Sequence, residues 1–288
     1  MSMLRGIESP ELSSKTEKAV EIIRRSKGVV VALSAGVDSS LVAFIAHATL
    51  GDRSIAATAA SESLSPGELE TAKRIADEIG IGHVIVRTHE LEDPNYSANG
   101  SNRCFYCKET LYKELRLIAD KHGMMAILDG TQLDDLSDDR PGLQAALQAG
   151  VISPLLLAGF RKRDVREAAR ALGLSVWDKP AMPCLSSRIA HGETVTEQKL
   201  SMVGEAEDFI RSLTGVSELR VRYHTGLARI EVGPDERNLF FNEAVMDTIS
   251  QKLLSLGFSS VTLDLRGYRS KAEPATAENR FALPIVNS

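Results

Sequence analysis

Apolar and polar positions along the first two thirds of the chain follow an alternating order of strands and helices. Continuous apolar runs with β-branched residues are typical of strands covered on both faces, whereas apolar residues three or four apart indicate helices. Strands are expected over 29–33, 54–60, 83–87 and 125–129, and helices over 38–50, 66–80, 108–122 and 161–173. This order predicts an α/β fold with a doubly wound, mainly parallel sheet, whose ligand lies at the carboxyl ends of the strands.

The pattern changes after about residue 194. A helical stretch over 196–213 precedes two alternating runs, 217–223 and 227–232, which predict a hairpin. A helix over 235–256 and a strand over 260–265 follow. We therefore expect an α/β domain over 1–194, a smaller α+β domain over 195–270, and a flexible tail over 271–288.

Three segments without clear periodicity are longer than a minimal connection needs: 88–103, 130–142 and 175–195. Loops of this length in a compact domain are frequently functional. Cysteines lie in or directly after two of them, so these are the first places to look for chemistry.

The composition is ordinary for a soluble globular protein, with 43% hydrophobic and 25% charged residues in 288. A net charge of −5 weighs against nucleic acid as the main partner. The sequence has no apolar run long enough to span a membrane and no apolar core of a signal peptide near its start, so a cytoplasmic location is expected. In that reducing compartment, three cysteines indicate metal or sulfur chemistry rather than disulfides.

The segment Ser34-Ala35-Gly36-Val37-Asp38-Ser39-Ser40 follows the first predicted strand and opens the first predicted helix. Small residues, hydroxyls and a helix N-terminus predict an anion-binding loop, the alternative being a strand-to-helix turn without a ligand. The loop is neither a Walker A motif nor GxGxxG. It resembles the PP-loop, Ser-Gly-Gly-x-Asp-Ser, of enzymes that cleave ATP between the α- and β-phosphates. Ala35 replaces the first glycine, which is tolerable only if its φ is negative.

Cys104 and Cys107 form a Cys-x-x-Cys at a loop-to-helix boundary, where a low thiol pKa is expected with Arg103 and Lys108 nearby. Cys184 lies far along the chain in an irregular segment. Three thiolates could hold three irons of a 4Fe-4S cluster. They could instead bind zinc with His191 as a fourth ligand, or Cys184 could be a reactive sulfur beside a separate redox pair, or all three could be inert.

These motifs together resemble the LarE family, ATP-dependent sulfur transferases that mature the nickel-pincer cofactor of lactate racemase. The resemblance covers nearly the whole chain and is carried by segments in the same order. Besides the PP-loop, they are Asn102-Arg103-Cys104-x-x-Cys107-Lys108, Asp129-Gly130-Thr131 with Asp134-Asp135 and Arg140-Pro141-Gly142, Pro183-Cys184-Leu185-Ser186-Ser187-Arg188, and the strands 220–222 and 228–232.

The resemblance implies a pyridinium-3,5-dicarboxylate mononucleotide substrate. ATP, with Mg²⁺, would adenylate a carboxylate and release pyrophosphate, and a sulfur nucleophile would then displace AMP and leave a thiocarboxylate. Binding both partners makes that attack effectively unimolecular. The resemblance also implies a homo-oligomer of the hexamer type, and a partner that is sulfide or a sulfur-donating protein.

Members of the family differ in their source of sulfur. Some carry only the cysteine that matches Cys184 and sacrifice its sulfur, which leaves dehydroalanine. Others carry three cysteines and resemble enzymes in which the open iron of a 4Fe-4S cluster holds the sulfide that is transferred. Since this chain has Cys104, Cys107 and Cys184, the cluster is favoured and sacrificial transfer is the alternative.

The resemblance assigns roles to single residues. The triplet Asp129, Gly130 and Thr131 would line the ATP end of the sheet, with simple capping of a loop as the alternative. Arg188 would steady the adenylate or the Cys184 thiolate. The PP-loop residues that would hold the phosphates and Mg²⁺ are Ser34, Gly36, Val37, Asp38, Ser39 and Ser40.

In the predicted hairpin, Arg220 and Arg222 share one strand face and would bind the substrate phosphate. The alternative for these arginines is a solvated or ion-paired strand face. Glu231 would orient the substrate or move a proton, or would pair with Arg229.

Two other functions fit parts of the sequence. A tRNA thiolase of the same superfamily would also use three cysteines, but those enzymes commonly have further cysteines or a basic surface. A non-catalytic adenine-nucleotide-binding module would need neither the cysteines nor the arginine pair.

Overall fold

The computed structural model describes residues 6–65, 67–137, 141–180 and 182–268. The chain divides into two compact units, with the boundary between Gly204 and Glu205. The predicted flexible tail over 271–288 and Arg140 of the quoted motif lie outside the described residues, as does Pro66 at the predicted start of a helix.

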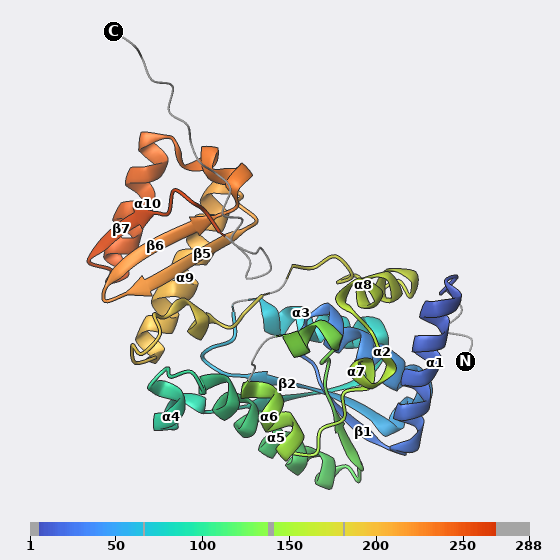
Figure 1. Cartoon of the computed structure of the whole chain (residues 1–288). Helices are drawn as coiled ribbons and strands as arrows, with labels where there is room; N and C mark the ends of the chain where they lie inside the picture. Colours follow the sequence, from blue (N-terminus) through green and yellow to red (C-terminus); the bar gives the residue numbers. More distant parts are fainter. Residues whose placement is uncertain (1–5, 66, 138–140, 181, 269–288) are drawn as a thin grey trace. The chain divides into compact units, whose positions relative to one another are not determined.

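The first unit is built on a sheet of four parallel strands (Figure 1). Its strands, in the spatial order β3-β2-β1-β4, are β3 (Gly82–Arg87), β2 (Ser54–Ala60), β1 (Val29–Ala32) and β4 (Ala126–Leu128). The chain leaves β1 toward β2 on one side and returns to β4 on the other, so the strand order reverses between β1 and β4. A ligand is expected where such a reversal occurs, outside the carboxyl ends of these two strands. The predicted α/β fold with a parallel sheet is confirmed.

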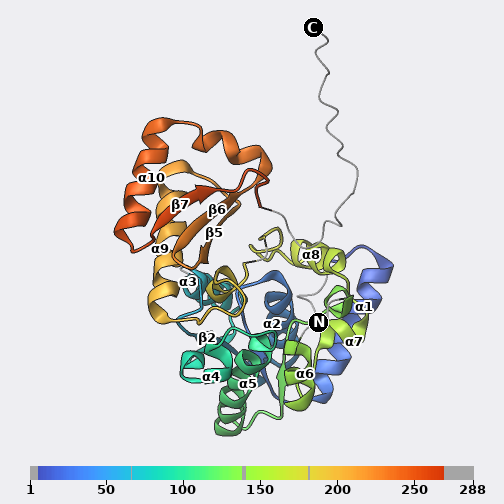
Figure 2. The same ribbon diagram turned by 60° about the vertical axis from the view of Figure 1, so that its left-hand side comes forward.

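Helices cover both faces of this sheet because its strands are apolar on both sides (Figures 1 and 2). Val29 and Val31 pack into a core with α1, α2 and α8, whereas Val30 and Ala32 pack against α5 and α6. The α-helices of this unit are α1 (Pro10–Arg25), α2 (Val37–Leu50), α3 (Glu68–Ile79), α4 (Pro94–Ser97), α5 (Arg103–Lys121), α6 (Pro141–Gln148), α7 (Pro154–Ala158) and α8 (Lys162–Ala171). Its 3-10 turns are η2 (Gly51–Arg53), η3 (Glu90–Glu92), η4 (Leu133–Ser137) and η5 (Leu185–Arg188).

Helix α9 (Glu197–Thr214) crosses the boundary between the units, and the second unit then forms a mixed sheet in the order β5-β6-β7. β5 (Leu219–His224) and β6 (Leu227–Val232) form the predicted hairpin, whose turn residues Thr225 and Gly226 both have positive φ. β7 (Ser260–Leu263) pairs parallel to β6.

The helix predicted over 235–256 is interrupted. It consists of the 3-10 turn η6 (Pro234–Phe240) and α10 (Glu243–Ser255). The Asn242 side chain accepts a hydrogen bond from the Val245 amide and so caps a new helix start at this point.

Among the described residues, no helix is both long and apolar enough to cross a membrane.

Candidate active site

Serine hydroxyl groups form hydrogen bonds within the loop after β1, at the N-terminus of α2. The Ser40 hydroxyl donates to the Gly36 carbonyl at 2.8 Å, and the Ser39 hydroxyl lies 3.1 Å from that oxygen and from the Ser34 hydroxyl. Within the described residues, no side chain caps the first amides of α2. These N–H groups therefore remain available to an anion at the positive end of the helix dipole.

Two residues make this loop tight. Gly130, directly after β4, lies so close to α2 that an added Cβ would be 2.7 Å from the Ser39 nitrogen and 2.9 Å from the Asp38 carbonyl carbon. Ala35 is fully buried and has a φ of +60°, in the left-handed region. The condition that its φ stays negative is therefore wrong: the loop holds an alanine in a glycine conformation, at a cost of about 1–2 kcal/mol.

Asp38 lies in the first turn of α2, and its carboxylate is only half satisfied. The Lys162 ammonium contacts its Oδ2 at 2.6 Å, while the buried Oδ1 has no hydrogen-bond partner among the described residues. Burial raises the pKa of Asp38, the Lys162 charge opposes this rise, and Asp135 adds to it. An orphaned carboxylate oxygen beside a phosphate-type loop fits a Mg²⁺ ligand, because Mg²⁺ prefers oxygen donors.

Two lysines reach this loop that the sequence pattern did not single out. Besides Lys162 on α8, Lys179 donates to the Ala35 carbonyl at 3.1 Å and to both oxygens of the buried Glu68 at 2.8 and 2.9 Å. Each ammonium group is paired with a carboxylate, Lys162 with Asp38 and Lys179 with Glu68. They come from segments 124 and 144 residues beyond the loop positions that they contact, so spacing gave no signal.

The Asp129 carboxylate is held by three neighbouring hydroxyl groups and one amide. Its carboxylate accepts from the hydroxyls of Tyr112, Thr131 and Ser153 at 3.2, 2.8 and 2.7 Å, and from the Thr131 amide at 3.2 Å. Asp129 and Thr131 thus cap the loop after β4, and their contact with ATP stays a prediction.

The three cysteines come together in the first unit. Cys104 and Cys107 lie in the first turns of α5, and Cys184 directly precedes η5. Burial raises the pKa of Cys107 to about 12, and the nearby Glu90, Cys184 and Cys104 raise it further against the opposing Lys108 charge. The expectation of a low pKa for Cys107 is wrong, because burial outweighs the helix N-terminus.

Hydrogen bonds fasten the Cys184 segment to the start of α5. The Arg103 guanidinium donates to the Ser186 carbonyl at 2.8 Å, and the Tyr96 and Ser186 hydroxyls lie 2.6 Å apart. The Asn99 amide donates to the carbonyls of Ile189 and Ala190 at 3.3 and 2.8 Å. The convergence of the cysteines is therefore set by protein contacts.

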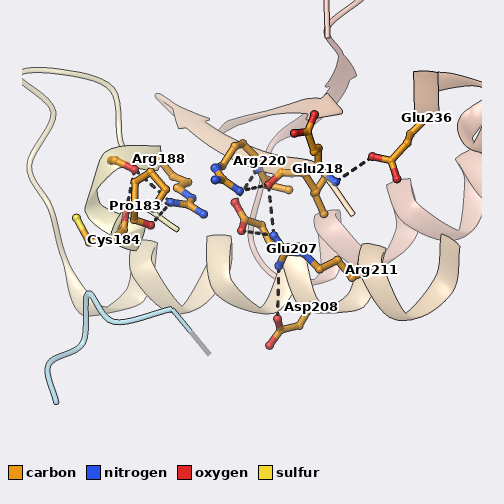
Figure 3. Close-up of polar contacts among 12 residues, drawn as sticks. Pro183, Cys184, Arg188, Glu207, Asp208, Arg211, Glu218, Arg220 and Glu236 are labelled. Carbon is orange, nitrogen blue, oxygen red and sulfur yellow. Dashed lines mark hydrogen bonds and ion pairs between the residues drawn. The ribbon is translucent and has the colours of Figure 1, made fainter. Parts of the chain in front are cut away.

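Arg188 is the largest fully buried side chain in the described part of the chain. Its Nη1 donates to the carbonyls of Pro183 and Cys184 and to the Ser187 hydroxyl, so it curls back onto the turn that carries Cys184 (Figure 3). These bonds hold the backbone of the turn that carries Cys184.

In the second unit, Glu231 joins two arginines. Its oxygens lie 2.7 Å from Arg222 Nε and 2.7 Å from Arg229 Nη2. Arg220 is buried, donates to the Leu219 carbonyl at 2.7 Å and lies 5.0 Å from the centre of the Tyr268 ring. The register places all four charged side chains on one face, since Arg220 lies opposite Glu231 and Arg222 opposite Arg229. The ion pairs of Glu231 with Arg222 and Arg229 lie on this face, and phosphate binding by Arg220 and Arg222 stays a prediction.

A buried carboxylate on α9 supports the free edge of this hairpin. Glu207 accepts from the Val221 amide at 3.1 Å and from Arg211, which lies in turn near Asp208 (Figure 3). Glu207 thus satisfies an edge-strand donor that β6 does not reach.

No three His, Cys, Asp or Glu side chains of the described chain are grouped closely enough to hold a single metal ion. His191 is exposed, and the zinc alternative gains no support from this arrangement.

A parallel sheet with a phosphate-type loop at its switch point defines an ATP-using enzyme of the PP-loop class. A sequence family described as asparagine synthase matches residues 11–101, which contain this loop. The chain is 39% identical over 263 residues to the pyridinium-3,5-bisthiocarboxylic acid mononucleotide synthase of Lactiplantibacillus plantarum, covering 90% of this chain and 93% of that protein. The chain belongs to this family, the LarE family, and is an ATP-dependent sulfurtransferase.

Two further proteins are similar to this chain. An uncharacterized protein of Synechocystis is 44% identical over 259 residues, covering 90% of this chain and 96% of the relative. The glutamine-hydrolyzing GMP synthase of Archaeoglobus fulgidus has a component that is 28% identical over 211 residues, covering 67% of this chain and 68% of the relative.

Proposed function

We propose that the chain adenylates a carboxylate of a pyridinium-3,5-dicarboxylate mononucleotide with ATP and replaces the activated oxygen by sulfur. The loop over 34–40 would bind the phosphates through the amides of α2, with Lys162 and Lys179 as counter-charges and the free Oδ1 of Asp38 as a Mg²⁺ ligand. Adenylation is needed because a carboxylate oxygen is a poor leaving group. The products of this step are an acyl-adenylate and pyrophosphate.

The observation that carries the sulfur half of the proposal is the convergence of three cysteines from two segments about 80 residues apart. Their chemistry fits a 4Fe-4S cluster held by Cys104, Cys107 and Cys184, since each thiolate in such a site binds a different iron and no common ion is required. When bound, a cluster with three protein thiolates supplies an open iron that can carry an additional sulfide. Arg188 and Arg103 would hold Cys184 in place for either a ligand or a donor role.

A continuous set of contacts links the cysteines to the ATP end. Lys108, next to Cys107, lies 5.5 Å from the centre of the Tyr112 ring, and the Tyr112 hydroxyl donates to Asp129. Burial acts to lower the pKa of Lys108, but the neighbouring Tyr112, Asp129 and Cys107 outweigh this effect, so the pKa of Lys108 is raised. A cation between the cysteines and the ATP end would suit the reaction, because both the adenylate and the sulfur nucleophile are anionic.

The test measures iron, acid-labile sulfide and zinc in the full-length chain purified without oxygen, together with pyrophosphate release that depends on the dicarboxylate nucleotide. About four irons per chain, lost in each of Cys104→Ala, Cys107→Ala and Cys184→Ala, is the expected result. One zinc without iron would overturn the cluster assignment. An iron-free protein that still transfers sulfur once, with a mass loss of about 34 Da at Cys184 (one H₂S), would assign the sacrificial route.

Pyrophosphate release without a dicarboxylate requirement, or with an RNA requirement, would overturn the proposed substrate. Salt-sensitive binding of RNA would accompany the latter. A homo-oligomer is part of the same proposal and is measured by light scattering on the same preparation.

A further inference from the structure

Glu90 is a buried carboxylate that none of the roles above uses. It lies in η3, the turn after β3, and is 3% exposed. The sequence placed it in the long segment 88–103 that leads into the Cys-x-x-Cys motif, but gave no sign that it is buried. Burial of a carboxylate is costly unless both oxygens find partners.

Only one oxygen of Glu90 has such partners among the described residues. Its Oε1 accepts from the Thr88 hydroxyl at 3.0 Å and from the Cys107 thiol at 3.8 Å. Its Oε2 is also buried and makes no hydrogen bond to any described residue. An unpartnered oxygen of this kind beside a cysteine site points to a ligand that is not a protein hydrogen-bond donor.

The missing partner must be positive if Cys107 acts as a thiolate. A thiolate cannot donate the hydrogen bond that Oε1 accepts from the thiol, so two buried negative groups would then lie side by side. Cluster iron would satisfy both groups, with Cys107 and Glu90 as the residues that hold it. The nearby Lys108 offsets part of this charge through space.

We propose that Glu90 is the fourth protein ligand of the cysteine site, and that its Oε2 holds the iron that no cysteine binds. The proposal rests on the proposed function, since it requires a 4Fe-4S cluster on Cys104, Cys107 and Cys184. Carboxylate is a harder ligand than sulfide, and cluster iron favours soft ligands. Glu90 would therefore keep the site closed to adventitious ligands and would be displaced by sulfide, a ligand exchange that transfers no electron.

The experiment compares wild type, Glu90→Gln and Glu92→Gln as full-length chains loaded with ⁵⁷Fe, by Mössbauer spectroscopy before and after addition of sulfide. Glu92 lies in the same turn, with an 82% exposed side chain, and is the matched control. In wild type and Glu92→Gln, about one iron in four should show an oxygen-ligated signal that sulfide removes. In Glu90→Gln this signal should be lost, and the fraction of 3Fe-4S form after mild oxidation should rise severalfold.

A second measurement does not depend on how the variant folds. Wild-type protein labelled with ¹³C at its glutamate carboxyl groups should show a ¹³C hyperfine coupling in the reduced cluster, and sulfide should abolish it. Four irons per chain with no such coupling, or an unchanged spectrum in Glu90→Gln, would overturn the assignment of Glu90 and leave the proposed function standing. Wild type without iron would overturn both.

Discussion

The contact between Gly130 and the first turn of α2 predicts that Gly130→Ala damages ATP use. The new Cβ would lie 2.7 Å from the Ser39 nitrogen and 2.9 Å from the Asp38 carbonyl carbon, both backbone atoms. Neither can rotate away as a flexible side chain could, so the loop or the helix must move.

The magnitude follows from overpacking. Forcing one methyl group into a filled site costs about 1–3 kcal/mol. At about 2–4 °C per kcal/mol for a unit of this size, the melting temperature should fall by about 2–12 °C. The shift would also displace the α2 amides that are proposed to bind the phosphates. Loss of one hydrogen bond to a charged group, about 1.5–3 kcal/mol, would raise the KM for ATP by about 10–100-fold.

Two assays check this prediction: thermal unfolding of the purified chain, and pyrophosphate exchange as a function of ATP concentration. The control is Gly82→Ala on β3, where an added Cβ meets nothing within 4 Å among the described atoms. It should match wild type in both assays. A Gly130→Ala chain with wild-type melting temperature and KM would refute the close packing of the two loops at the switch point.

Three further results are expected. Ala35→Gly should leave the free energy of unfolding within about 1 kcal/mol of wild type, because relief of about 1–2 kcal/mol of left-handed strain offsets the glycine entropy and the lost methyl group. The control Ala43→Gly, buried within α2, should lose about 1.5–2 kcal/mol in urea unfolding. Equal losses in the two variants would contradict the strain at Ala35. Burial raises the pKa of Asp38, so the folded chain holds this proton more tightly and loses stability as the pH rises from about 4 through the folded pKa. Over that range, the melting temperature of Asp38→Asn should rise relative to that of wild type. A constant difference in melting temperature would contradict the effect of burial. Glu231→Gln should cost about 1–3 kcal/mol in chemical denaturation, because two arginines lose their carboxylate, while the exposed Asp235→Asn should change little.

Most of the sheet could be predicted from the sequence because its strands are short, apolar and bounded by small residues. Helix α1 was not predicted, although Leu12, Ala19, Val20 and Ile23 form a buried stripe after the cap residue Ser9. The segment is polar overall, so its helical spacing of apolar residues is clear only when the second half of the helix, with Ala19, Val20 and Ile23, is included. The parallel pairing of β7 with β6 depends on tertiary packing and has no local signature.

Only those parts of the candidate site whose residues form one short sequence motif could be predicted. The loop over 34–40 and the cysteines could be found this way, but Lys162, Lys179, Glu68 and Glu90 could not. Each of these four joins the site through the fold, from a segment with no motif of its own. The pKa of Cys107 shows the same limit. The neighbouring basic residues predicted a lowered pKa, but burial, which a sequence does not display, raises it.

The lacing of the Cys184 segment by Tyr96, Asn99 and Arg103 has a consequence for how the enzyme is made and repaired. In a zinc finger the metal organises the chain, so a chain without metal is unfolded. Here the arrangement does not wait for iron, because hydroxyl, amide and guanidinium groups already hold the cysteine segments together. With the proposed cluster, the chain would fold before it is loaded, and a cluster destroyed by oxygen would be rebuilt on the same molecule without unfolding it.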